Sequence, residues 1–131
     1  MILFSALTVV RSKVWENGVT LWSDVLSKYP KNGRALSSIG LVYSQKGDYK
    51  KALEYYKKTL DIDLKIYDEI HPYIAADYCN VGLALNKIGD YDNALKYNEK
   101  ALDIRLKLYG EEHPDVAEAY INLGETFYDP G

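Results

Sequence analysis

The side chains of this chain that are best suited to chemistry are two histidines, His71 and His113. They occupy equivalent places in a repeated sequence, and a proline follows each of them. A zinc site needs several ligands that converge, and the sequence contains neither an HExxH nor a CxxC motif. Because proline is favoured in the first turn of a helix, we interpret both histidines as residues at which a helix begins.

The remaining reactive side chains do not form a recognisable catalytic arrangement. Cys79 is the only cysteine, so it cannot form an internal disulfide, and we expect a buried, inert thiol. No glycine loop that would cradle a phosphate and no Ser-His-Asp pattern is present. Asp48 and Asp90 are interpreted as helix caps, and Asp61 and Asp103 as solvated helix residues. We therefore expect no enzyme activity, no metal and no cofactor in this segment.

Composition indicates one folded domain, over residues 1–131. The chain is 47% hydrophobic and 27% charged, with a formal net charge of -3. That apolar content is sufficient for a packed core. No stretch is dominated by lysine and arginine, so nucleic acid is not an expected partner. The compartment stays open, with the cytoplasm as the default.

The first part of the chain, from Met1 to Val10, is almost wholly apolar. A membrane-spanning helix needs about 20 such residues, and the basic start of a signal peptide is missing. Two interpretations stay open: a buried core helix, or the end of a membrane helix that begins upstream. A membrane is an expected partner only in the second case.

A repeat with a period of about 42 residues organises the chain. Gly40, Gly82 and Gly124 recur at this spacing, and residues 47–67 match residues 89–109 at 13 of 21 positions. Units of this kind stack into solenoids and bury a shared core only together. We divide the chain into a degenerate first repeat (1–32), two full repeats (33–74 and 75–116) and a partial repeat with one helix (117–131).

Each full repeat is predicted to contain two antiparallel helices. Ile74, Tyr78 and Val81 follow one another at spacings of four and three, which is the period of a helix. Gly89 is the residue type that can end this helix in the left-handed conformation, and Asp90 can cap the next one. Residues 60–66 alternate in hydropathy as a strand would. We favour a long second helix instead, because no turn residue separates this segment from the helix before it.

The three recurring glycines fall within the first helices of their repeats. Glycine inside a helix costs roughly 1 kcal/mol relative to alanine, so something must offset that cost. Ala52 and Ala94 follow Gly40 and Gly82 at the same offset, in the second helix of each repeat. We expect these alanines to face the glycines across each hairpin, so that the two backbones approach closely.

These residues and spacings resemble the tetratricopeptide repeat family. Its pattern of a large residue, Leu-Gly, Tyr, Ala, an aromatic residue and Ala is similar to Leu36, Ile39-Gly40, Tyr43, Ala52, Tyr56 and Thr59. In the next repeat, Asn98 stands where an aromatic residue is expected. The long period and the His-Pro pairs look like the repeat variant of kinesin light chains. The resemblance implies an all-α, right-handed superhelical solenoid of antiparallel helix hairpins, with about seven helices.

In this family the first helices of the repeats line a concave groove that binds peptides or partner helices. The resemblance places eight residues of this chain in the groove: Arg34, Ser38, Leu41, Asn80, Leu83, Asn86, Lys87 and Asn122. An asparagine can donate and accept, so it can clamp the backbone amides of a peptide. Some members also bind a C-terminal carboxylate, but Ala76 and Glu118 stand where they have cations. We therefore expect a scaffold for a protein or peptide partner, without a full carboxylate clamp.

Two alternative functions stay open. The chain could be the soluble C-terminal tail of a membrane-bound glycosyltransferase with tetratricopeptide repeats, a family that it resembles at Arg11, Trp15, Trp22, Pro30 and Asn32. It could also be a self-association module. The third repeat has a first helix only, so an uncapped end would leave three residues without cover and favour a homo-oligomer; these are Tyr120, Leu123 and Phe127.

Overall fold

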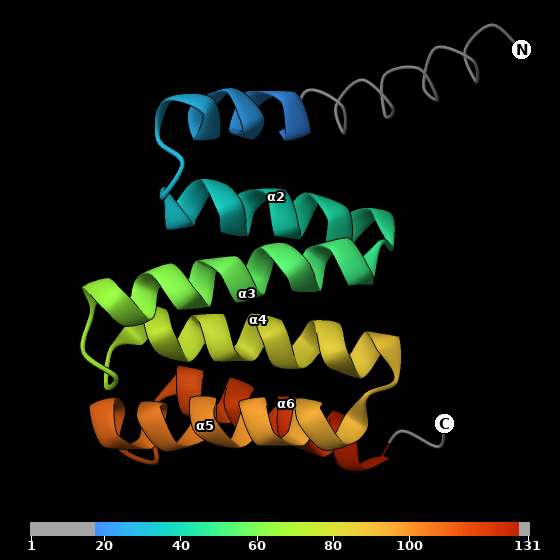
Figure 1. The fold of residues 1–131 in the computed structure, drawn as a ribbon. Coiled ribbons are helices and arrows are strands. Elements are labelled where there is room, and N and C mark those ends of the chain that lie inside the picture. The colour runs from blue at the N-terminus through green and yellow to red at the C-terminus, as the bar shows by residue number, and fades with distance from the viewer. Residues whose placement is uncertain (1–17, 129–131) are drawn as a thin grey trace, which may run out of the picture.

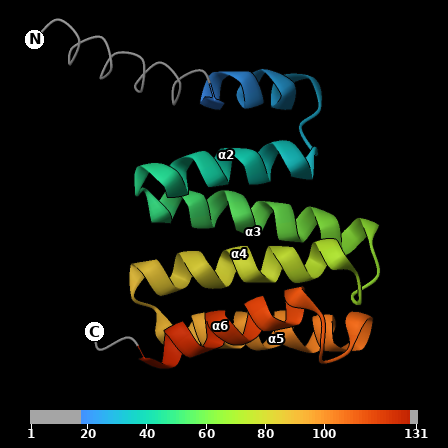
Figure 2. The same ribbon diagram turned by 180° about the vertical axis from the view of Figure 1, so that it is seen from behind.

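The computed structural model describes residues 18–128, and every regular element in that range is a helix. Residues 18–28 are helical, and five longer helices follow: α2 (Gly33–Lys46), α3 (Tyr49–Ile66), α4 (Pro72–Ile88), α5 (Tyr91–Tyr109) and α6 (Pro114–Tyr128). Successive helices run antiparallel and stack one after another along the molecule (Figures 1 and 2). The predicted all-α stack of hairpins is therefore confirmed. The apolar segment Met1–Val10, together with Arg11 and Trp15, lies outside the described residues.

The two histidines begin helices, as the sequence predicts. The Nδ1 atom of His71 accepts a hydrogen bond from the backbone N–H of Tyr73 at 3.0 Å. The Nδ1 atom of His113 accepts one from the backbone N–H of Asp115 at 3.1 Å. Each imidazole thereby satisfies an N–H group that has no partner within its helix. The two histidines have the same structural role, one repeat apart.

The corners between paired helices are formed by glycine and aspartate. Gly47 and Gly89 end α2 and α4 with φ of 92° and 99°, in the left-handed region that favours glycine. Asp48 and Asp90 then accept hydrogen bonds from backbone N–H groups in the first turns of α3 and α5. The second helices continue without a break to Ile66 and Tyr109, so the strand alternative is wrong.

The core is a seam of small and branched residues along the stacked helices. Its centre is α4, which packs against both α3 and α5. Its fully buried members include Ala52, Ile74, Val81 and Ala94. Cys79 is also buried, as predicted, and burial raises the pKa of its thiol. A higher pKa leaves less thiolate, which is the reactive form.

The side chains nearest to the mid-helix glycines Gly40 and Gly82 come from the second helix of each hairpin. A Cβ atom on Gly40 would lie 2.8 Å from the ring of Tyr56, and one on Gly82 would lie 2.8 Å from Cγ of Asn98. Tyr56 and Asn98 each follow the predicted alanines, Ala52 and Ala94, by one helical turn. Each of these two glycines thus makes room for a side chain of the paired helix.

Asn98 stands where the family pattern has an aromatic residue, and its buried Oδ1 atom has no hydrogen-bond partner. It is almost fully buried, and its Nδ2 donates to Oγ1 of Thr126 at 3.2 Å. The Thr126 hydroxyl in turn donates to the backbone carbonyl of Asn122 at 3.0 Å. A short polar side chain therefore replaces ring packing with a link between α5 and α6.

Candidate binding groove

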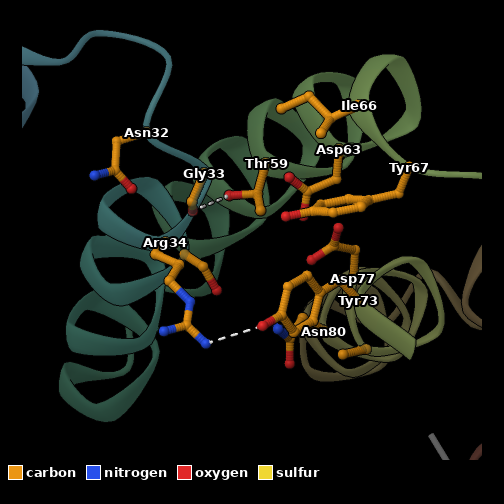
Figure 3. A pocket seen from close by; sticks show the side chains of 12 residues that line it. Asn32, Gly33, Arg34, Thr59, Asp63, Ile66, Tyr67, Tyr73, Asp77 and Asn80 are labelled. Carbon is orange, nitrogen blue, oxygen red and sulfur yellow. Dashed lines mark hydrogen bonds between the residues drawn. The ribbon is translucent and has the colours of Figure 1, made fainter. Parts of the chain in front are cut away.

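Two neighbouring hollows lie along α2 and α4, and we call them together the groove. The larger, of about 560 Å³, is closed by the end of α3, and the smaller, of about 360 Å³, extends toward the helical segment 18–28. Three residues line both hollows, namely Arg34, Ser37 and Asn80, so the two form one continuous surface. Figure 3 shows the larger hollow from close by.

Half of the residues predicted from the family resemblance meet in the groove. Arg34 and Ser38 come from α2, and Asn80 comes from the facing side of α4. Leu41, which is 52% exposed, adds an apolar contact surface at the smaller hollow. The groove therefore combines a cation, a hydroxyl, an amide and an aliphatic side chain within reach of one ligand.

The other four predicted residues do not line these two hollows. Leu83, Asn86 and Lys87 lie further along α4, and Lys87 is exposed in its last turn. Asn122 is only 7% exposed, on α6, and its Nδ2 has no hydrogen-bond partner. Its side chain is covered by neighbouring residues rather than presented to a partner.

The acidic residues of the larger hollow were not predicted from the sequence. Asp63, near the end of α3, and Asp77, on α4, point toward one another beside the ring of Tyr67 (Figure 3). Asp77 is 6% exposed, and no donor reaches its Oδ2 atom. Burial, a hydrogen bond with Asp63 and the charge of Asp63 together raise the pKa of Asp77 to about 8. At neutral pH the Asp77 carboxyl therefore holds the proton, and Asp63 accepts it in a hydrogen bond.

A comparison of the repeats contains the signal that could have revealed this pair. When successive repeats are aligned, Asp77 falls at the position of Ala35 and Ala119, both of which are buried. Asp63 aligns with Arg105, at one of the positions where residues 47–67 and 89–109 differ. The carboxyl pair is therefore specific to this one junction between repeats.

Aromatic rings form the wall of the hollow beside the carboxylates. The rings of Tyr67 and Tyr73 meet edge to face, with centroids 5.3 Å apart, and Tyr67 also stacks on His71. Arg34 donates from Nη2 to the Tyr73 hydroxyl at 3.3 Å and lies 5.6 Å from the centre of that ring. None of the ion pairs in the described range includes Asp63 or Asp77. The acidic pair is left without a cation from these residues.

At the next junction the charge pattern is reversed. Arg105 is buried there, and its Nη1 donates to the backbone carbonyl of Asp115 at 3.0 Å. The same nitrogen lies 3.7 Å from a carboxylate oxygen of Glu118. Glu118 stands where a carboxylate-binding member of the family would have a cation. Its carboxylate instead lies beside Arg105 of the same chain.

Two further properties of residues 18–128 bear on function. No three His, Cys, Asp or Glu side chains in this range come together in a way that could hold a metal ion. Within the same range, none of the helices combines the length and the apolar character needed to cross a membrane.

Comparisons with known proteins agree with the repeat architecture. Sequence models described as "Tetratricopeptide repeat" match residues 72–131 and residues 33–65, which together are more than half of the chain. No curated protein sequence matches.

Among solved structures, BtubC (BKLC) from P. vanneervenii is similar at 24% identity and a TM-score of 0.81, over 95% of this chain and 53% of that one. The nearly identical TPR-like repeats of a kinesin light chain protein from Podosopora anserina are similar at 18% identity and a TM-score of 0.78, over 89% of this chain and 59% of that one. The Sgt2 TPR domain from Aspergillus fumigatus is 22% identical with a TM-score of 0.68, over 94% of this chain and 72% of that one. At these identities the likeness establishes the fold, and the chain spans little more than half the length of the first two structures.

Proposed function

This chain belongs to the tetratricopeptide repeat proteins, and from that premise we propose that it is a non-catalytic scaffold that binds a protein or peptide along the groove of α2 and α4. Tetratricopeptide repeats are typical of protein–protein interaction modules. Solenoids of this kind offer extended surfaces lined by equivalent helices of successive repeats. The chain's place among them makes a binding role the best-supported function.

The observation that carries the proposal is the continuity of the groove. Ser38 and Asn80 occupy equivalent positions in successive repeats, and both line the hollow next to Leu41. A hydroxyl and an amide can bond to the main chain of an extended peptide, while an exposed leucine contacts its side chains. Those two kinds of contact are what a peptide-binding surface requires.

The test compares a groove variant with a control variant, after partners have been identified by pull-down and mass spectrometry. The double change Ser38→Ala with Asn80→Ala removes two hydrogen-bonding groups from the groove. Gln45→Ala removes an amide from an exposed position of the same helix α2 and is the matched control. We expect the double variant to lose partner affinity by tenfold or more at unchanged helix content, and the control to retain it. Equal affinity of both would overturn the assignment of the groove.

Self-association is a second candidate function, and it rests on α6. Tyr120 and Ile121 are 52% and 62% exposed, although both are large apolar side chains. Adjacent apolar residues that are exposed in this way can form a contact between two copies of the chain. In this proposal, α6 of one copy covers α6 of another.

No observation in the described range favours the glycosyltransferase-tail alternative. Of the residues that carry this resemblance, Asn32 has a structural role, because its side chain accepts a hydrogen bond from the backbone N–H of Ala35 at 3.1 Å and caps α2. Trp22 lines the smaller hollow of the groove. Both residues are thus accounted for by the solenoid.

A further inference from the structure

We propose that the larger hollow is a docking pocket for one positively charged side chain, lysine or arginine, of the bound peptide, with Asp63 and Asp77 as its acidic floor. This inference rests on the proposed scaffold function and specifies what one part of the groove recognises. Tyr67 and Tyr73 form its aromatic wall.

The first argument is that the floor contains a buried acceptor without a donor. Asp77 is almost fully covered, and its Oδ2 atom has no hydrogen-bond partner. A buried polar atom that is left unsatisfied is unfavourable, so such atoms are few in proteins. Asp77 lines the hollow and points into it beside Asp63 (Figure 3), so a ligand with N–H donors could reach this atom. An ammonium or guanidinium group supplies such donors together with the opposite charge.

The second argument concerns Asp63, whose side chain reaches from α3 to the start of α2. A Cβ atom on Gly33 would lie only 2.9 Å from its Oδ1 atom, so the carboxylate packs closely against the first residue of that helix. The N-terminus of a helix favours negative charge. The start of α2 therefore favours a negative charge at this place, and Asp63 lines the hollow there.

The third argument is that the cation that lines the pocket, Arg34, points away from its carboxylates. Arg34 is hydrogen-bonded to the Tyr73 hydroxyl and lies over the Tyr73 ring, away from the two carboxylates (Figure 3). At the equivalent junction between the next repeats, Arg105 and Ala119 stand in place of Asp63 and Asp77. The preference for a cation is accordingly confined to one pocket of the solenoid.

Binding should depend on pH, because a bound cation favours the charged form of both carboxyl groups. The free pocket holds a proton on Asp77, whose pKa is raised to about 8. Below that pH the proton must leave when the cation enters, so affinity should rise by up to about tenfold between pH 6 and pH 7, by less between pH 7 and pH 8, and level off at higher pH. The other titratable or charged groups that face Asp77 are Arg34 from α2, Asp63 and Tyr67 from the end of α3, and Tyr73 from α4. His71 stacks on Tyr67 close by, so a variant of Asp77 is needed to assign the pH dependence to this carboxyl group.

The pocket can be tested by nuclear magnetic resonance titration of the ¹⁵N-labelled chain. The probe is N-acetyl-arginine amide, and its neutral counterpart is N-acetyl-glutamine amide. We expect the arginine probe to shift the amide signals of residues around the hollow in a saturable way, and the neutral probe to bind at least tenfold more weakly. Equal binding of the two probes would overturn the proposal, as would tighter binding of free spermidine, which would point to a polyamine rather than a peptide side chain.

Variants make the test specific to the two carboxylates. Asp63→Asn and Asp77→Asn should each weaken the arginine probe by tenfold or more, and Asp77→Asn should abolish the pH dependence. Asp61→Asn, at an exposed position of α3 shortly before Asp63, is the matched control and should bind normally. If Asp77→Asn does not fold, Asp63→Asn and Asp77→Ala, which copies the buried alanine of the other repeats, still decide the matter. Unchanged binding by folded variants would refute the pocket.

The same variants distinguish this inference from the wider function. If partner binding survives Asp63→Asn but is lost in the Ser38→Ala, Asn80→Ala double variant, the groove is a binding surface and the cation pocket is wrong. Loss of binding in both indicates that the pocket and the groove recognise one ligand.

Discussion

Replacing Asp77 with asparagine should make the stability of this fold less sensitive to pH. The Asp77 carboxyl has its pKa raised from 3.8 to about 8, first by burial and then by Asp63. Between these two values the folded chain retains a proton that the unfolded chain releases. Stability attributable to Asp77 is therefore fully present below pH 3.8 and is lost as the pH rises toward 8.

The size of the effect follows from the single proton. One proton held across one pH unit is worth about 1.4 kcal/mol, so between pH 5 and pH 7 the wild type should lose about 3 kcal/mol that the variant keeps. Asparagine has nearly the same shape and does not titrate. The variant should thus be close to the wild type at pH 4 and more stable than it at pH 8.

Urea unfolding followed by circular dichroism at several pH values measures this difference. The two proteins differ only at residue 77, so the contributions of the groups that they share cancel when the two curves are subtracted. Asp61→Asn, an exposed neighbour on α3, should follow the wild type at every pH. Parallel curves for wild type and Asp77→Asn would refute the reasoning, because they would mean that Asp77 ionises in the folded chain much as it does in the unfolded one.

Four further variants test the packing, a helix cap and the end of the stack. Gly82→Ala should destabilise the fold by about 1–2 kcal/mol in urea unfolding, because its Cβ would press on buried Asn98. Gly124→Ala should instead stabilise the fold by up to about 1 kcal/mol, because nothing lies within 4 Å of its Cβ. A change of the same sign in both variants would contradict this account of the packing. His71→Ala should cost about 1 kcal/mol through loss of the cap of α4, and an unchanged midpoint would show that the cap contributes nothing. Tyr120→Ser with Ile121→Ser should weaken self-association in sedimentation velocity, and a wild-type chain that remains monomeric at millimolar concentration would remove the second candidate function.

Local signals were sufficient to predict the helices. Their ends follow from residues that act within a few positions of themselves, such as His71 before a proline and Gly89 before Asp90. The long second helices were also predictable, because no residue in 60–66 can break a helix. In a solenoid each repeat packs mainly on its neighbours, so local sequence signals are enough to predict where the helices begin and end.

What could not be predicted depends on how two helices are staggered in space. The atoms nearest to a Cβ on Gly82 come from Asn98 on the paired helix, and no local pattern specifies that contact. Asp63 and Asp77 lie on different helices with a loop between them, so neither one alone differs in type from a solvated or capping aspartate. Only their meeting across the junction of α3 and α4 makes them a pair.

The strongest reason to assign a function to this junction is that stacking does not require it. The chain already contains a better solution for a buried position on this face of a first helix, since Ala35 and Ala119 occupy it in the neighbouring repeats and are covered. Asp77 instead introduces a carboxyl group whose charged form is disfavoured by burial and by Asp63. Groups that lower stability without helping the fold are characteristic of functional sites, because activity is what retains them. A cation that enters from a partner would convert this unfavourable pair into a specific contact, and the energy released would be available only to ligands that carry such a group.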